Sequence, residues 1–350
     1  MGWLGLDDTD SLEQGCTTFT FHLLLAGLPD AVEVLSPKLV RLWPFAQQRT
    51  RGNAAVAVEL KTEDEEQLLE YLETFWSQNI APFAGRRSES HHDSRQQYPS
   101  DPGMVWFSSE RPEEAFYTAS VRHEVQLSDV PPATRSWGGQ GRIGATAAVC
   151  WRERQPTWEA IVWRTLERHG QNERFVCEAT LHRIDHLPST FLSRDPRKGT
   201  SFVAPRGPCP VLFGIRARDA DTAQRAGTEL RNAEQTEDSI GMRVFVTNQA
   251  TDDHLSEPVQ STVLSTEVLN RGSTCIVTEN GQWMAFEESG PIKLLAQWLR
   301  PGDVIEGNGL SPEAGVMHLE KLRLISSVPS RERPKCDKCK VRMKSMGSGQ

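Results

Sequence analysis

The most constraining feature of this 350-residue chain is the order of apolar segments between Trp3 and Trp76. Short apolar runs typical of strands alternate with runs of helical spacing, in the order strand, helix, strand, strand, helix. The third strand is almost wholly apolar, which indicates a central position in a sheet. We predict strands at residues 3–6, 39–43 and 53–60, a helix at 17–26 and a second helix after a capping box at 62–65. This order is the opening of a ferredoxin-like α/β sandwich.

The rest of the chain adds two further folded regions. A polar loop at 84–103 precedes a fourth strand at 104–107, and Val130-Pro131-Pro132 is typical of a linker. A second α+β unit is indicated by strands at 143–151, 159–163, 211–216 and 242–246 and by a helix at 219–229. An OB-type β-barrel is indicated by strands at 274–278, 283–286, 304–306 and 317–324, an Asn280-Gly281 turn and one helix at 293–298.

We therefore predict an α+β multidomain protein of ferredoxin-like α/β sandwiches followed by an OB-type β-barrel and a partial zinc-ribbon tail. A hydrophobic content of 37% and a charged content of 25% are typical of folded globular domains. No apolar run approaches the ~18 residues of a membrane span, and the acidic start of the chain is unlike a signal peptide. The seven scattered cysteines argue against a disulfide framework, so we expect a cytoplasmic protein without a membrane partner.

Charge is spread unevenly along the chain. The net charge is −8, yet residues 331–350 carry seven basic and two acidic side chains, so the tail contributes +5 and the body −13. A basic tail on an acidic body suggests contact with a polyanion at one end. A solvated tail without a partner explains the same pattern equally well.

The sharpest local feature is the acidic turn Asp7-Asp8-Thr9-Asp10-Ser11, directly after the first strand. Mg²⁺ takes oxygen ligands, usually one or two carboxylates together with substrate phosphates. The plain alternative is an Asx-type turn that only ends the strand. Thr17 and Thr18 follow where the first helix begins, and helix N-termini bind phosphate through free N–H groups. Either threonine can be an ordinary N-cap or a phosphate acceptor. Metal ligands beside a phosphate cradle are what phosphoryl transfer requires.

Two glycine-containing loops are further candidates. Arg51, Gly52 and Asn53 precede the central strand and can clamp phosphate, although a solvated loop is as good an explanation. Gly139-x-Gly141-x-x-Gly144 matches the dinucleotide fingerprint, but no credible strand precedes it, so we reject a nicotinamide cofactor. A turn at a nucleotide or RNA backbone stays open, beside a plain flexible turn.

Two further pairs complete the candidates. Asp252 and Asp253 follow a predicted strand and can receive a cationic substrate, although a satisfied loop is the default. Cys336 and Cys339 have the spacing of half a zinc site, which needs four ligands. The chain stops at Gln350 without a second CxxC pair, so we expect zinc to be possible but its site incomplete.

Eight motifs in order along the chain resemble the archaeal 2-agmatinylcytidine synthetases that modify the minor isoleucine tRNA. They are GLDDTDS, GCTTF, KLVRLWP, RTRGNAAVAV, GQGRIGATAAV, PCPVLFGIR, FVTNQATDDHL and HLEKLRLI. The resemblance implies a kinase-like catalytic domain (1–134), a ferredoxin-like domain (135–258), an OB domain (261–328) and an incomplete zinc ribbon (332–350). That family's ribbon carries a second CxxC, so the resemblance also suggests a truncated chain.

The resemblance also implies an activity and roles for residues. ATP would activate the C2 carbonyl oxygen of the wobble cytidine in the CAU anticodon, and agmatine would replace it. Asp7, Asp8 and Asp10 resemble Mg²⁺ ligands, Thr17 the phosphorylated threonine, and Arg51, Gly52 and Asn53 a nucleotide-binding loop. Thr9, Ser11, Thr18, Gly139 and Gly141 are expected beside the ATP phosphates, and Asp252 and Asp253 beside agmatine. Two alternatives stay open: a non-catalytic OB-type RNA-binding protein and a Mg²⁺-dependent nucleotide hydrolase.

Overall fold

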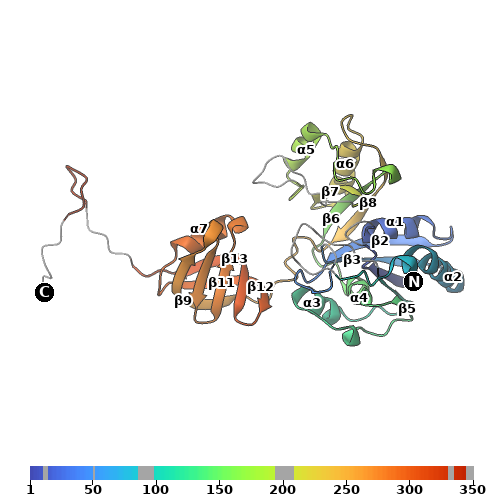
Figure 1. Cartoon of the computed structure of the whole chain (residues 1–350), viewed down its shortest axis with the longest axis horizontal. Coiled ribbons are helices and arrows are strands. Elements are labelled where there is room, and N and C mark those ends of the chain that lie inside the picture. Colours follow the sequence, from blue (N-terminus) through green and yellow to red (C-terminus); the bar gives the residue numbers. More distant parts are fainter. Residues whose placement is uncertain (11–14, 50–51, 86–97, 194–208, 330–334, 344–350) are drawn as a thin grey trace. The chain divides into compact units, whose positions relative to one another are not determined.

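The computed structural model describes residues 1–10, 15–49, 52–85, 98–193, 209–329 and 335–343. Two compact units divide the chain, the first from Met1 to His254 and the second from Leu255 to Gln350 (Figure 1). Among the helices of the described ranges, none is long and apolar enough to cross a membrane.

The first unit is built on one eight-stranded sheet in the order β5-β4-β1-β3-β2-β8-β6-β7. The strands are β1 (Gly2–Asp7), β2 (Glu33–Arg41), β3 (Ala54–Lys61), β4 (Gly103–Phe107), β5 (Arg135–Gly138), β6 (Thr157–Arg164), β7 (Val211–Ala217) and β8 (Ser239–Thr247). The helices are α1 (Thr17–Ala26), α2 (Glu65–Phe75), α3 (Glu114–Arg122), α4 (Arg142–Cys150), α5 (Glu178–Asp185) and α6 (Ala220–Arg231). Neighbouring strands are antiparallel except β2 and β8, which pair in parallel at Lys38 and Leu39.

Alternation along β3 shows why both faces of the sheet are covered. Val56, Val58 and Leu60 pack in one core with residues of α1 and α2. Ala55 and Ala57 point the other way and pack with α3 and α4. Successive side chains of a strand point to opposite faces of the sheet. A strand whose side chains are apolar on both faces therefore needs a layer of helices on each side. The predicted central position of this strand is confirmed, because β3 pairs with β1 and β2.

The second unit is a small barrel. Five strands close in the order β10-β11-β13-β12-β9 around a core that contains Val263, Ile276, Trp283 and Ile305. The elements are β9 (Val259–Val268), β10 (Thr274–Thr278), β11 (Gly281–Ala285), α7 (Pro291–Trp298), β12 (Val304–Glu313) and β13 (Val316–Ser326). The predicted hairpin turn at Asn280-Gly281 joins β10 to β11, and Gly281 has a φ of 114°.

One predicted element is wrong. Residues 143–151 were expected to form a strand, yet residues 142–150 form the helix α4. Seven of its nine residues are buried, because α4 lies against β1, β3 and β4. A short run that is buried on all sides has no periodicity that distinguishes a strand from a helix. The four-residue strand β5, which precedes α4, was not predicted at all. Both β5 and α4 follow the Pro131-Pro132 segment and pack with the strands before it.

Candidate active site

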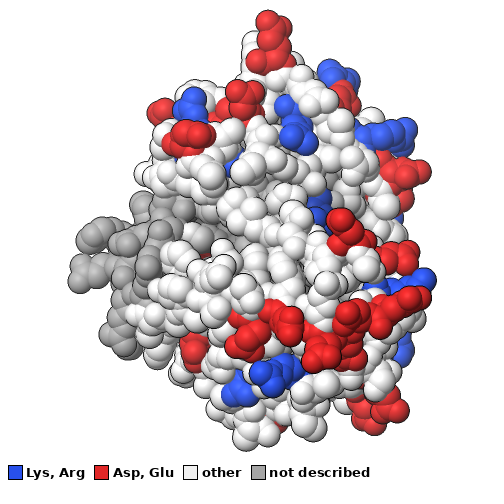
Figure 2. All heavy atoms as spheres, turned by 90° about the vertical axis from the view of Figure 1, so that its right-hand side faces the viewer, with Lys and Arg blue, Asp and Glu red and all other residues white. Residues whose placement is uncertain are grey.

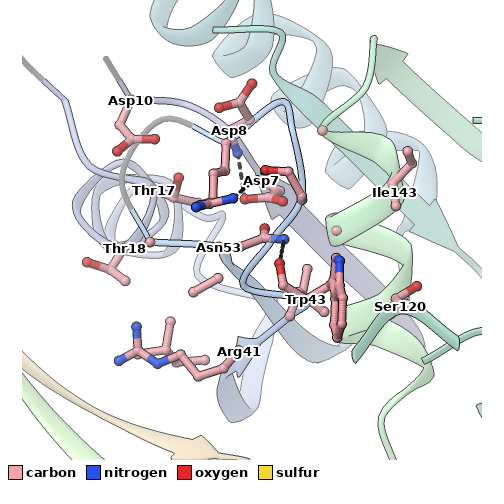
Figure 3. Close-up of a pocket in the computed structure, with 18 of the residues that line it drawn as sticks. Asp7, Asp8, Asp10, Thr17, Thr18, Arg41, Trp43, Asn53, Ser120 and Ile143 are labelled. Carbon is pink, nitrogen blue, oxygen red and sulfur yellow. Dashed lines mark hydrogen bonds between the residues drawn. The ribbon is translucent and has the colours of Figure 1, made fainter. Parts of the chain in front are cut away.

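A pocket of about 560 Å³ opens in the first unit. Its walls come from the loop after β1, the start of α1, the ends of β2 and α3, the segment before β3, the start of α4 and the strands β6 and β7. Eight of the predicted site residues line it: Asp7, Asp8, Asp10, Thr17, Thr18, Gly52, Asn53 and Gly141. The fold thus brings together segments that lie far apart in the sequence (Figure 3).

The three predicted acids lie at one end of this pocket. Asp7 ends β1, and its Oδ1 accepts a hydrogen bond of 2.7 Å from the backbone N–H of Asp8. Asp8 has a φ of 56°, and its Oδ2 accepts a hydrogen bond of 2.6 Å from the N–H of Asp101. Burial, then the charge of Asp8 and after it that of Asp10, raise the pKa of Asp7 well above its usual range, while the Asp8 N–H opposes this. The turn therefore holds acids close enough to repel one another, which a cation would relieve.

Helix α1 begins beside these acids. Its N-cap is Cys16, which makes no side-chain capping hydrogen bond, so the expectation that Thr17 or Thr18 is the N-cap is wrong. The Thr17 hydroxyl accepts a hydrogen bond of 3.3 Å from the N–H of Thr9 and lies toward the acids (Figure 3). The Thr18 hydroxyl accepts one of 3.2 Å from Trp163 Nε1 and lies 3.0 Å from Cys16 Sγ. The two threonines thus face different surroundings.

The glycine-rich segment closes the pocket beside Asp7. Gly144 is in the first turn of α4, where a Cβ would come within 1.9 Å of Asp7 Oδ2. Gly139 lies against Asp101 and is outside the lining of the pocket, whereas Gly141 belongs to it. Contrary to the sequence-based expectation, a strand does precede the segment, namely β5. It pairs antiparallel with β4, so the segment is not the first turn of a parallel βαβ unit.

The loop before β3 lines the pocket in part. Asn53 Nδ2 donates a hydrogen bond of 2.8 Å to the carbonyl oxygen of Trp43 (Figure 3). Arg49 Nη1 donates one of 2.6 Å to the carbonyl oxygen of Ala46. Two predicted site residues, Ser11 and Arg51, lie outside the described residues.

Two predicted groups lie away from this pocket. Asp253 Oδ2 accepts hydrogen bonds from Tyr117 Oη at 2.6 Å and from Trp151 Nε1 at 3.2 Å, and neither Asp253 nor Asp252 lines the pocket. These hydrogen bonds are what a satisfied loop would make, and the expected place of both acids beside agmatine stays a prediction. Thr9 is buried and lines a smaller cavity on the other side of the acidic turn.

Among the charged lining residues that the sequence did not predict, three lie together. Glu159 on β6 is buried, and its Oε2 lies 2.9 Å from Arg41 Nη2 while its Oε1 lies 3.6 Å from Arg216 Nε. The only signal for them was a charge within an otherwise apolar strand. Strand pairing alone brings the three together, and a single sequence does not reveal it.

The two predicted zinc ligands lie in the second unit. A bridge between Lys335 and Arg342 closes the turn that carries Cys336 and Cys339. Hydrogen bonds from the N–H groups of Cys339 and Lys338 lower the pKa of the Cys336 thiol, which favours the thiolate that metals bind. In the described part of the chain, no group of three or more His, Cys, Asp or Glu side chains is placed to hold a metal ion.

Comparisons with known proteins agree along the chain. The family model of the TiaS TCKD domain matches residues 3–138 and that of the TiaS FLD domain residues 139–254. The chain is 31% identical to the isoleucine-tRNA 2-agmatinylcytidine synthetase TiaS of Methanopyrus kandleri, over 99% of this chain and 86% of that protein.

Solved structures of TiaS have the same fold. A complex of TiaS with its isoleucine tRNA and ATP is 27% identical, with a TM-score of 0.79 over 100% of this chain and 87% of that chain. A complex of TiaS with the same tRNA, AMPCPP and agmatine is 25% identical, with a TM-score of 0.77 over 96% of this chain and 86% of that chain. By sequence and by structure, the chain belongs to the TiaS family.

Proposed function

We propose that this protein uses ATP to join agmatine to C2 of the wobble cytidine of the isoleucine tRNA with a CAU anticodon, giving 2-agmatinylcytidine. The relatives named as 2-agmatinylcytidine synthetases support the reaction, and the TiaS complex with isoleucine tRNA, AMPCPP and agmatine supports the three substrates. The observation that carries the proposal is the shared pocket of the acidic turn, the start of α1 and the first turn of α4.

The acidic end of the pocket suits Mg²⁺ bound together with phosphate. Asp7 is a partly buried carboxylate whose pKa is raised by burial and by Asp8 and Asp10, so a cation would stabilise its charged form. Asp8 Oδ2 already accepts a hydrogen bond from the N–H of Asp101, and no three acids of the described residues are placed to hold one ion, so we propose Asp7 and Asp10 as the two carboxylate ligands in place of all three acids. Mg²⁺ commonly takes one or two carboxylates and completes its shell with phosphate and water. When bound, it would neutralise phosphate charge.

The chain's own groups would position the phosphoryl transfer. The start of α1 offers N–H groups and a positive dipole end to the phosphates. Gly141 and Gly52 line the pocket without side chains, so phosphate can approach the backbone closely. Thr17 presents its hydroxyl at the same end, and we propose it as a phosphate acceptor beside the cytidine O2. A phosphorylated O2 leaves as phosphate when the deprotonated amine of agmatine attacks C2, whereas an unmodified carbonyl oxygen is a poor leaving group.

Surface charge fits a cationic amine and an RNA that is bound elsewhere. Exposed Glu66, Glu70 and Glu73 lie on α2, and Figure 2 shows acidic side chains gathered in a band on this side of the molecule. Such a face repels an RNA backbone. The segment after residue 330 has the opposite charge, since it is basic, and it therefore favours contact with tRNA.

We propose the following division of labour along the chain. Residues 1–134 are the kinase-like catalytic domain and 135–258 a ferredoxin-like domain; the order β4-β1-β3-β2, with α1 and α2 on one face, supports a ferredoxin-like core for the first. Residues 261–328 form an OB-type barrel, a common platform for nucleic acids. Residues 332–350 are an incomplete zinc ribbon, in which Cys336 and Cys339 would be two of the four ligands. The seven free cysteines fit a cytoplasmic protein.

The test is incorporation of labelled agmatine into an isoleucine tRNA transcript with a CAU anticodon. We expect incorporation that requires both ATP and Mg²⁺, and none into a transcript whose wobble C is replaced by U. Binding of the transcript without any ATP turnover would instead support a non-catalytic RNA-binding protein. ATP turnover that neither tRNA nor agmatine stimulates would support a nucleotide hydrolase.

A further inference from the structure

The pocket has a second charged end, built from residues to which no role has been given. Arg41 ends β2, Glu159 lies on β6 and Arg216 on β7, and all three line the pocket. Figure 3 shows Arg41 at the side of the pocket away from Asp7, Asp8 and Asp10. One cavity thus has an acidic end and an arginine-rich end.

Glu159 forms ion pairs with both arginines. Its side chain is 4% exposed, and each of its two oxygens faces one arginine. Gly214 packs against it closely, since a Cβ at Gly214 would come within 2.7 Å of Glu159 Oε1. Burial acts to raise the pKa of Glu159, but Arg216 and Arg41 outweigh it, so the pKa is lowered and the carboxylate is charged. Because each of its oxygens already faces an arginine, the guanidinium of agmatine would have to approach Glu159 past two like charges, which disfavours agmatine at this position.

The arginines, in contrast, have hydrogen-bonding capacity to spare. Two guanidinium groups against one carboxylate leave a net charge of +1 at this end. The Nε–H of Arg41 is buried and has no hydrogen-bond acceptor among the described residues, and the buried Nε–H of Arg216 lies 3.6 Å from Glu159 Oε1, beyond hydrogen-bond distance. A buried donor without an acceptor costs about 1–3 kcal/mol. A ligand that brings several anionic oxygens would remove this cost, and guanidinium groups match phosphate geometry.

We propose that Arg41 and Arg216, oriented by Glu159, bind a backbone phosphate of the substrate RNA and thereby position the nucleotide that reacts at the acidic end. The inference rests on the proposed function. The triphosphate of ATP has its own cradle at α1 and the acidic turn, where a cation can neutralise it. The remaining anion among the three substrates is the phosphodiester backbone of the RNA.

The experiment compares Arg216→Gln, Arg216→Lys and Arg41→Gln with Arg183→Gln in the full chain. Arg183 pairs with Glu229 on the exposed surface of the same unit, outside the pocket, and is the matched control. The readouts are KM for the tRNA transcript, for ATP and for agmatine, each at several salt concentrations. Thermal unfolding of each variant shows whether it is folded.

For the two glutamine variants we expect KM for the transcript to rise roughly tenfold. The slope of log KM against log salt concentration should decrease by about one, which corresponds to the loss of one phosphate contact. KM for ATP and for agmatine should stay within about twofold. Arg216→Lys keeps the charge and should retain most of the salt dependence. Gly214→Ala keeps both arginines but displaces Glu159, so KM for RNA should rise less, with an unchanged salt slope.

A rise in KM for ATP or agmatine in place of that for RNA would overturn the inference, as would glutamine variants that behave like Arg183→Gln. Either result requires an active wild-type enzyme, so it leaves the proposed ligase activity standing. Absence of agmatine incorporation by the wild type would contradict the proposed function instead.

Discussion

Thr17 and Thr18 show how far residues of one type can differ at neighbouring positions. Both are buried at the start of α1, but the Thr17 hydroxyl lies at the acidic turn while that of Thr18 holds the indole of Trp163 on β6. The sequence predicted that this segment starts a helix beside acids, because both features are local. It could not distinguish the two hydroxyls, because Trp163 is 145 positions away in the chain.

Replacing each threonine by valine, which has nearly the same shape, separates their roles. Thr17→Val should abolish transfer of labelled γ-phosphate to the protein and lower agmatine incorporation at least about 100-fold. Thr18→Val leaves the buried Trp163 Nε1–H without its acceptor and should cost about 1–3 kcal/mol of unfolding free energy while phosphate transfer persists. Phosphate labelling and denaturant unfolding measure the two effects. Labelling that survives in Thr17→Val but not in Thr18→Val would instead identify Thr18 as the phosphate acceptor.

Asp7→Asn tests the acidic end. Burial and the neighbouring acids raise the pKa of Asp7, so its ionised form opposes folding at neutral pH in the absence of a cation. An amide of the same size removes that opposition but binds Mg²⁺ poorly. We expect a melting temperature equal to or above that of the wild type, with activity reduced at least about 100-fold. The exposed N-cap acid Asp64, changed to Asn, is the control and should keep its activity. A destabilised Asp7→Asn that retains activity would assign the residue to the fold.

At the scale of elements, α4 explains both the success and the failure of reading the sequence. The strands β1, β3 and β4 and the helix α1 were predicted because each is an apolar run bounded by turn residues, and α2 because its apolar residues recur at helical spacing, although its N-cap is Asp64 and the predicted capping box at 62–65 is wrong. Helix α4 has neither, since it is packed against the sheet without a solvent face over most of its length. Its close approach relies on missing side chains: a Cβ at Gly5 would lie 2.2 Å from the carbonyl oxygen of Ala145, and one at Gly103 would lie 1.9 Å from the N–H nitrogen of Arg142.

The fit of α4 predicts the effect of Gly144→Ala. Alanine favours a helix over glycine by up to about 1 kcal/mol, but its Cβ would meet Asp7 Oδ2, and overpacking costs about 1–3 kcal/mol. We expect a modest loss of stability and a large loss of agmatine incorporation, because the Asp7 carboxylate must move. Gly227→Ala in α6 is the matched control, since its Cβ would crowd Ala160 and Met242 away from the pocket. Equal losses of activity in both variants, each measured beside its melting temperature, would contradict a specific role for Gly144.

At the scale of the whole first unit, two sets of strands join into one sheet. The β-ladder between β2 and β8 is short, and Asn248 strengthens it: its Oδ1 accepts a hydrogen bond from the N–H of Arg41 at 2.7 Å and its Nδ2 donates one to the carbonyl oxygen of Arg41 at 2.9 Å. The sequence indicated two α+β units, and it held no signal for this junction, which depends on a few long-range contacts. The pocket spans the same junction. Only the part of the site that is built from local motifs, at the acidic turn and the start of α1, could therefore be predicted from the sequence.

The last prediction concerns His22, which lies on α1 at this junction. Its ring stacks on Trp163 with centroids 4.5 Å apart, and Arg243 Nη2 lies 3.4 Å from its Nδ1. Burial, followed by the charge of Arg243, lowers the pKa of His22 from its usual 6.5 to about 4. Above pH 6.5 the residue is neutral in the folded and unfolded states and adds no pH dependence. Between about 6.5 and about 4 the unfolded chain binds a proton that the folded chain refuses, so the free energy of unfolding falls as the pH falls.

The shift would amount to about 3 kcal/mol for a fully buried group, and the partial exposure of His22 reduces this to about 1–2 kcal/mol. Urea unfolding of the wild type at steps between pH 7 and pH 4 measures it. His22→Gln loses the stacking on Trp163, so its stability should be lower at pH 7, but its decline toward pH 4 should be shallower by that amount. His182→Gln, at an exposed position of α5, should leave the wild-type decline unchanged. Parallel declines in the wild type and in His22→Gln would show that acid loosens this junction through other groups.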